Sequence, residues 1–112
     1  HAKRFTQALI ALKEQLASYP NGHYTGNVQY WLGEVYMAQG EYVDAKNAFL
    51  AVLNQHRDSS KVPDATYKLG RLHDRMGDKE QAQKYLKSVI SLYPKSSAAR
   101  LSDTYLESLS DY

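Results

Sequence analysis

Apolar side chains recur at intervals of three and four residues in six stretches of the chain, and polar or charged residues fill the positions between them. This spacing is typical of one face of an α-helix and differs from the alternation of a β-strand. The pattern predicts helices at about 2–19, 25–39, 41–55, 63–76, 78–92 and 96–110. Because the connections are short, consecutive helices should be antiparallel. The predicted fold class is therefore all-α.

The sequence also repeats itself at an offset of 37 residues. The matched pairs are Tyr30/Tyr67, Leu32/Leu69, Gly33/Gly70, Gly40/Gly77, Ala45/Ala82 and Phe49/Leu86. Self-similarity at a fixed period indicates stacked helix pairs that share a continuous core. We expect one repeat domain over 1–112, with the second helix of a truncated repeat at 1–22, full repeats at 23–58 and 61–94, and a capping helix at 95–112.

Glycines and one aspartate indicate how each pair is built. Gly33 and Gly70 fall in the middle of predicted helices, where glycine costs about 1 kcal/mol relative to alanine, so they should allow close approach of the paired helix. Gly40 and Gly77 should end the first helix of each pair. Asp78 has the chemistry of an N-cap for the helix that follows it.

The final predicted helix, about 96–110, carries an incomplete apolar stripe. Serines and acidic residues occupy most of its other positions. A terminal helix with one polar face closes the exposed end of a repeat stack. The residues expected to face inward are Ala99, Leu101, Tyr105, Leu106 and Leu109.

Composition narrows the possible functions of the chain. Its 14 basic and 12 acidic residues are dispersed and leave a net charge of +2, so a nucleic-acid partner is not expected. No apolar run approaches the length of a membrane span, so membrane insertion is not expected either. There is no cysteine, which removes thiolate metal ligands and cysteine nucleophiles.

The residues that carry chemistry in enzymes form no recognisable site. The four histidines are scattered without metal-ligand spacing, and no glycine-rich phosphate loop or nucleophile elbow is present. We therefore predict no catalytic residues, no metal site and no cofactor. The lack of a recognisable catalytic site argues against the alternative that the chain is a small-molecule or peptidoglycan-modifying enzyme.

The repeated elements resemble the tetratricopeptide repeat family. The resemblance rests on Leu-Gly, a Tyr or His three residues later, a second glycine, and then Ala and a bulky residue. Two features depart from the family pattern: the usual tryptophan position of the first helix holds Gln29 and Thr66, and the period is 37 instead of 34. The resemblance implies a right-handed superhelix of antiparallel helix pairs.

A longer resemblance links the chain to the C-terminal domain of the YbgF/CpoB family of Tol-Pal-associated cell division coordinators. The segments that carry it are 19–24, 27–34, 61–65, 68–70 and 93–99, including the Tyr30-Trp31-Leu32-Gly33 block. It implies a non-enzymatic periplasmic scaffold that binds TolA and links outer-membrane constriction to septal peptidoglycan synthesis by a synthase complex. Family members trimerise through an N-terminal coiled coil, which is missing from this sequence. A generic adaptor, such as an outer-membrane assembly lipoprotein or a co-chaperone, is the alternative.

The tetratricopeptide resemblance also indicates where a partner should bind. In that family the concave wall is lined mainly by the first helix of each pair. Mapped onto this sequence, the candidate partner-binding residues are Asn27, Tyr30, Trp31, Glu34, Met37, Asp64, Tyr67, Lys68, Arg71, Asp74 and Arg75. They would make an aromatic and basic groove for an extended or helical peptide. Packing between repeats is the alternative role of Trp31, and a solvated face is the alternative for the basic residues.

Overall fold

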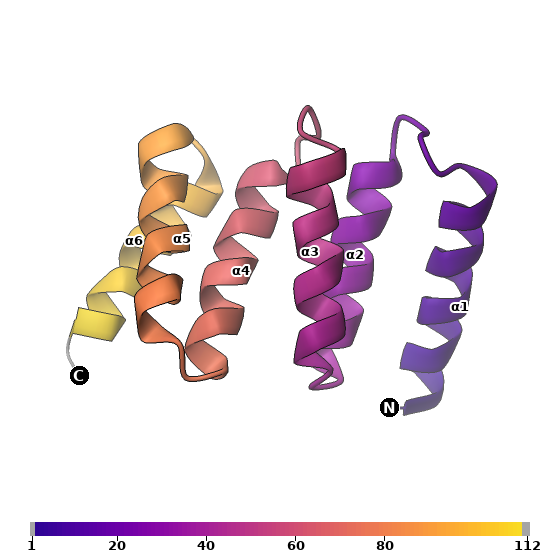
Figure 1. Ribbon diagram of the computed structural model, residues 1–112, viewed down its shortest axis with the longest axis horizontal. Helices are drawn as coiled ribbons and strands as arrows, with labels where there is room; N and C mark the ends of the chain where they lie inside the picture. Colours follow the sequence, from indigo (N-terminus) through magenta and orange to yellow (C-terminus); the bar gives the residue numbers. More distant parts are fainter. Residues whose placement is uncertain (1, 111–112) are drawn as a thin grey trace. The chain divides into compact units, whose positions relative to one another are not determined.

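The structure is a computed structural model that describes residues 2–110, and the side chains of residues 4–109 (Figure 1). The described residues form six α-helices and no strand. The helices are α1 Ala2–Ser18, α2 Thr25–Ala38, α3 Tyr42–Gln55, α4 Val62–Arg75, α5 Lys79–Leu92 and α6 Ser97–Ser110. The predicted all-α fold is confirmed, and every predicted helix is present.

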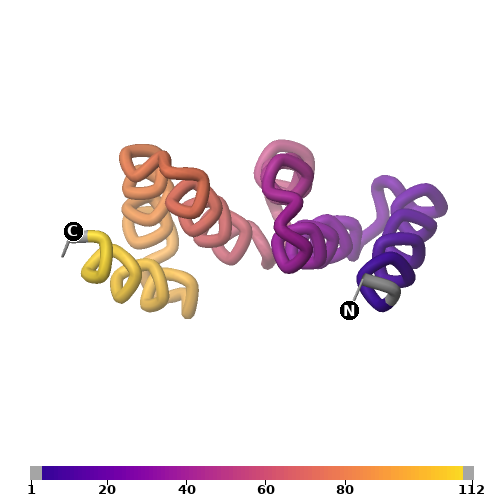
Figure 2. Tube along the Cα trace, turned by 90° about the horizontal axis from the view of Figure 1, so that it is seen from below, coloured from indigo at the N-terminus to yellow at the C-terminus, as the bar shows by residue number. Residues whose placement is uncertain are grey.

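The chain divides into two compact units, residues 1–62 and 63–112. The first contains α1, α2 and α3, and the second contains α4, α5 and α6. Within each unit consecutive helices run antiparallel (Figure 1), and the second view shows that they lie side by side (Figure 2). That residues 1–112 act as a single repeat domain stays a prediction.

The core of the first unit lies between α2 and α3. Ala45, Phe49 and Val52 of α3 are completely buried. Gly33 of α2 lies directly against the Phe49 ring, because a Cβ atom at Gly33 would be only 2.6 Å from Phe49 Cε1. The absence of a side chain at Gly33 therefore sets how closely these two helices approach, as predicted from the sequence.

α1 packs against the other side of α2 less completely. Its inward-facing apolar residues are only partly buried: Phe5, Ala8, Leu9, Leu12 and Leu16. Thr25 Oγ1 at the start of α2 donates a hydrogen bond of 2.8 Å to the Tyr19 carbonyl oxygen, which fixes the connection. Lys13 Nζ also lies 5.7 Å from the centre of the Tyr36 ring. Two kinds of contact therefore hold α1 against α2: the hydrogen bond at the connection that follows α1, and the side-chain contacts along one face of α1.

The second unit repeats the glycine contact one period later. A Cβ atom at Gly70 of α4 would lie 2.7 Å from Leu86 Cγ of α5 and 3.3 Å from the Ala82 carbonyl oxygen. The buried cluster that includes this region extends from α4 through α5 to α6, and its members are Tyr67, Ala82, Leu86, Val89, Ala98, Ala99 and Leu109. The second unit therefore uses the same pairing geometry, with leucine in place of phenylalanine.

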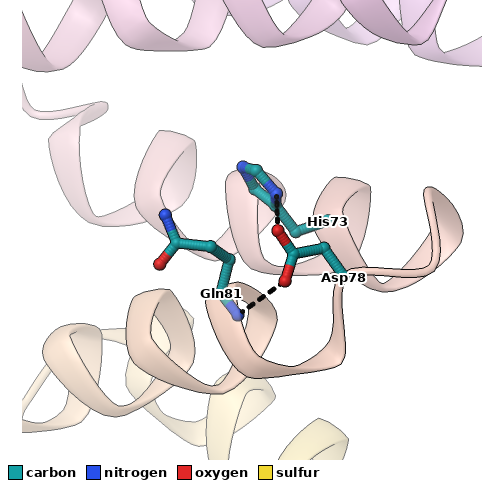
Figure 3. Close-up of polar contacts among 3 residues, drawn as sticks. All are labelled: His73, Asp78 and Gln81. Carbon is teal, nitrogen blue, oxygen red and sulfur yellow. Dashed lines mark hydrogen bonds and ion pairs between the residues drawn. The ribbon is translucent and has the colours of Figure 1, made fainter.

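The predicted helix ends are also confirmed. Gly40 and Gly77 have φ angles of 78° and 85°, the left-handed conformation that glycine adopts without a steric penalty. Asp78 caps α5, because its Oδ1 atom accepts a hydrogen bond of 3.2 Å from the Gln81 backbone N–H (Figure 3). Its Oδ2 atom lies 3.7 Å from Nδ1 of the buried His73. One carboxylate thus joins the end of α4 to the start of α5.

One expectation about α6 is wrong. Leu101, predicted to face inward, is 51% exposed, whereas Ser102 and Ala98 are 0% and 1% exposed. The buried line of α6 runs through residues 98, 102 and 109, and Leu101 precedes Ser102 by one position, about 100° around the helix. The small side chains at 98 and 102 let α6 pack closely, although the Ser102 hydroxyl finds no hydrogen-bond partner among the described residues.

The glycine contact predicts a specific response to a larger side chain. Gly33→Leu should lower the free energy of unfolding by about 1–3 kcal/mol, because the new side chain would overlap the Phe49 ring. The control is Ala38→Leu at the exposed end of the same helix, which should change it by less than about 0.5 kcal/mol. Urea unfolding followed by circular dichroism measures both. A Gly33→Leu protein as stable as the parent would contradict the close approach.

The register of α6 predicts a contrast between two leucines. Leu109→Ala should cost about 2–5 kcal/mol, because it empties a buried site. Leu101→Ala should cost less than about 0.5 kcal/mol, because that side chain is half exposed. Thermal melts of the two variants give the comparison. Equal losses would mean that the helix is rotated from the position described.

Candidate protein-binding site

The predicted residues of the first unit occupy one face of α2. Asn27, Tyr30, Trp31, Glu34 and Met37 follow one another at helical spacing. Tyr30 is buried, with 7% of its surface exposed, whereas Trp31 is 49% exposed. Asn27, Glu34 and Met37 are partly buried. Trp31 is therefore the main exposed aromatic side chain of this face, and Tyr30 is its buried neighbour.

Trp31 is held by neighbours that form a small aromatic and cationic platform. Its ring meets the Tyr30 ring edge-on, with centroids 5.3 Å apart, and Tyr30 in turn packs on Phe49 at 5.7 Å. Lys61 Nζ lies 5.1 Å from the Tyr30 ring centre and 5.3 Å from the Trp31 ring centre, within the range of a cation–π contact. We call Tyr30, Trp31 and Lys61 the α2 platform.

Lys61 was not predicted as a site residue. It reaches the α2 platform because the connector after α3 folds against the start of α2. Ser59 Oγ accepts a hydrogen bond of 3.1 Å from the Lys61 backbone N–H, and a Cβ atom at Gly26 would lie 2.5 Å from that same oxygen. Lys61 begins the 61–65 segment of the family resemblance, but nothing in the sequence pairs it with Trp31. Only the path of the connector places it beside that ring.

The predicted residues of the second unit lie on α4. Tyr67 is buried, Lys68, Arg71 and Asp74 are partly buried, and Arg75 is exposed. These residues belong to a different unit from Asn27, Tyr30, Trp31, Glu34 and Met37. That the two sets line one continuous groove stays a prediction.

Arg71 is the central residue of the α4 face. Its guanidinium carbon lies 5.8 Å from the Tyr67 ring centre and 5.6 Å from the Tyr105 ring centre, and the two rings meet edge-on at 6.4 Å. The Tyr105 hydroxyl donates a hydrogen bond of 2.6 Å to Asp74 Oδ2. We call Tyr67, Arg71, Asp74 and Tyr105 the α4–α6 cluster. Sequence reasoning assigned Tyr105 to the core of the capping helix and missed its contact with Arg71.

The environment of Tyr105 changes its acidity. Burial, the hydrogen bond to Asp74 and the negative charge of Asp74 raise the pKa of Tyr105 to about 12, while Arg71 acts in the opposite direction. The burial effect is the largest of these. Tyr105 therefore remains a hydrogen-bond donor throughout the physiological pH range.

Two hollows of the first unit are lined by none of the predicted site residues. A mainly apolar hollow of about 270 Å³ is lined by Leu16, Tyr19, Tyr24, Val28 and adjacent residues between α1 and α2. A polar one of about 410 Å³ is lined in part by His23, His56 and Asp58. Among the residues that the structure describes, no group of three or more His, Cys, Asp or Glu side chains could hold a metal ion.

These features define a class of protein: a helical repeat that presents aromatic and charged side chains from the first helix of each pair. Residues 24–95 match the Tetratricopeptide repeat family, and the chain belongs to that family. Tetratricopeptide repeats form extended surfaces that bind other proteins.

A narrower similarity points to particular proteins. Two relatives named Cell division coordinator CpoB, both from Pseudomonas putida, are each 51% identical to this chain over 39 residues. The aligned part is 35% of this chain and 15% of each relative. The chain is thus similar to a small part of these proteins. No helix of the described residues is long and apolar enough to cross a membrane.

The raised pKa of Tyr105 predicts late ionisation. Because the folded pKa of about 12 exceeds the ordinary tyrosine value of 10.0, the contribution of this group to stability is complete below about pH 10 and is lost as the pH rises through 12. In an alkaline titration followed by tyrosinate absorbance, Tyr105→Phe should remove a late-ionising tyrosine. Tyr24→Phe, at a 66% exposed residue, is the control. If Tyr105→Phe instead removes a tyrosinate absorbance step near pH 10, Tyr105 ionises like an ordinary tyrosine and the prediction is wrong.

Proposed function

We propose that this chain is a non-enzymatic protein-binding module of the periplasm. In this role it binds the envelope protein TolA and helps to coordinate outer-membrane constriction by the Tol-Pal system with septal peptidoglycan synthesis during cell division. The similarity to Cell division coordinator CpoB supports this role, and membership of the tetratricopeptide repeat family supports the general activity of protein binding. Oligomerisation would require a coiled coil outside this sequence.

The observation that carries the proposal is the exposure of Trp31. A tryptophan that is 49% exposed and backed by a buried tyrosine gives a partner a large rigid apolar surface without the need to order a flexible side chain. Tryptophan, tyrosine and arginine are the residues that dominate binding energy at protein interfaces. The α2 platform has two of these types, with Lys61 adding a positive charge beside the rings.

The basic residues of α4 give a second, electrostatic contribution. Lys68, Arg71 and Arg75 recur at intervals of three and four residues, so they lie along one side of the helix. Exposed charges near an interface mainly change the association rate and its salt dependence. An acidic or mixed-charge segment of the partner fits this face better than a basic one.

The test is titration of a TolA fragment against the protein by calorimetry. Trp31→Ala should weaken binding by about 2 kcal/mol or more, close to thirtyfold, because it removes the exposed aromatic surface. Val43→Ala, at a 68% exposed apolar residue of α3, is the matched control and should bind like the parent. Circular dichroism should give the same helical signal for all three proteins.

The possible outcomes test two claims separately: that the chain binds TolA, and that the α2 platform is the binding site. If the parent does not bind TolA, the proposed partner is wrong, and the generic adaptor becomes the better description. If Trp31→Ala binds as tightly as the parent, the partner uses the convex face or the loops, and the α2 platform is not the site.

A further inference from the structure

Arg71 carries a positive charge that no carboxylate among the described side chains pairs with directly. Its side chain is partly buried, and its Nε atom is fully buried without a hydrogen-bond partner among the described residues. Among the described side chains, residues 4–109, the guanidinium forms cation–π contacts with Tyr67 and Tyr105 and interacts with the Tyr105 hydroxyl, but it forms no ion pair with a carboxylate. Buried or partly buried charges in proteins are normally paired. This arrangement therefore leaves the guanidinium without its usual counter-ion.

A carboxylate of the right spacing is nevertheless present. Asp74 follows Arg71 by three residues on the same helix, a separation at which oppositely charged side chains commonly pair. Its Oδ2 atom instead accepts the 2.6 Å hydrogen bond from the Tyr105 hydroxyl, a short bond of the kind that a charged acceptor makes. Tyr105 comes from α6, 31 residues further along the chain than Asp74. The capping helix thus determines which partner Asp74 takes.

We propose that Tyr105 holds Asp74 away from Arg71 and so keeps the Arg71 guanidinium available for an acidic side chain of the protein partner. This inference rests on the proposed function as a protein-binding module and names the chemistry of one of its subsites. Tyr105 is a positioning residue in this arrangement, and α6 is part of the binding site in addition to closing the repeat stack.

The surroundings of Arg71 indicate the kind of segment that would bind. A planar guanidinium pairs with a carboxylate through two parallel hydrogen bonds. The partly exposed Tyr105 ring offers apolar surface to the methylene groups of a glutamate, and Arg75 adds a further positive charge one turn away. We therefore expect the ligand to be a glutamate side chain within an acidic segment, and not the carboxylate at a chain terminus.

The test uses peptides whose only carboxylates are side chains. An acetylated and amidated peptide of alternating Glu and Ala is titrated into labelled protein, and the Arg71 Nε–Hε resonance and the α6 amides are followed by NMR. The same peptide with Gln in place of Glu is the reference. The Glu peptide should shift the Arg71 resonance and bind at least about tenfold more tightly than the Gln peptide.

Three variants test the role of Tyr105. Tyr105→Phe keeps the ring and removes the hydroxyl, so Asp74 is released to pair with Arg71, and binding of the Glu peptide should weaken by about tenfold. Adding Asp74→Asn to Tyr105→Phe removes that competing charge and should restore binding to within about threefold of the parent. Tyr93→Phe is the matched control in the same unit and should bind like the parent.

The rescue distinguishes positioning from simple stabilisation. If the double variant binds as weakly as Tyr105→Phe, or if Tyr105→Phe binds like the parent, Tyr105 does not control Arg71 through Asp74 and the inference fails. Equal binding of the Glu and Gln peptides would exclude the carboxylate subsite, whether or not TolA binds. Failure of TolA to bind a protein that still prefers the Glu peptide would overturn the proposed partner alone.

Discussion

The contact between a glycine and a large apolar side chain underlies each helix pair of this protein. Gly33 lies against Phe49, and Gly70 lies against Leu86 one period later. A glycine within a helix costs about 1 kcal/mol of helix propensity, and dense packing of the opposing side chain offsets that cost. Because the contact fixes the distance and rotation of the paired helices, it also determines which faces of α2 and α4 remain exposed.

The α2 platform and the α4–α6 cluster both combine aromatic rings with a positive charge, but they differ in how the rings and the charge are arranged. On the α2 platform, the aromatic ring of Trp31 is exposed, and the Lys61 amino group lies over it. In the α4–α6 cluster the rings are the support, and the Arg71 guanidinium rests on them. Tyr30 and Tyr67 occupy the same repeat position in both, and both are 7% exposed. They are therefore better described as the buried base of each surface than as its contact area.

Contacts from outside the repeat helix complete both surfaces. Lys61 comes from a connector that is held by Ser59, and Tyr105 comes from the terminal helix. The Tyr105 ring packs against the buried cluster, whereas its hydroxyl bonds Asp74, so the polar group can change a binding face while the ring keeps its place in the core. Related repeats can therefore keep one core and differ in the partners that they bind.

The sequence alone determined the helices, their pairing and their ends, because these depend on interactions between residues close along the chain. The 37-residue period, the glycines at 33 and 70 and the cap at Asp78 all carry a local physical signal. It also correctly placed Trp31 and Arg71 on the first helix of each pair. The partners of those residues depended on the tertiary structure, because Lys61 and Tyr105 are distant from Trp31 and Arg71 in sequence and no sequence pattern pairs them. The exposure of Leu101 was likewise decided by packing, because small residues at 98 and 102 let α6 approach its neighbour with a different face.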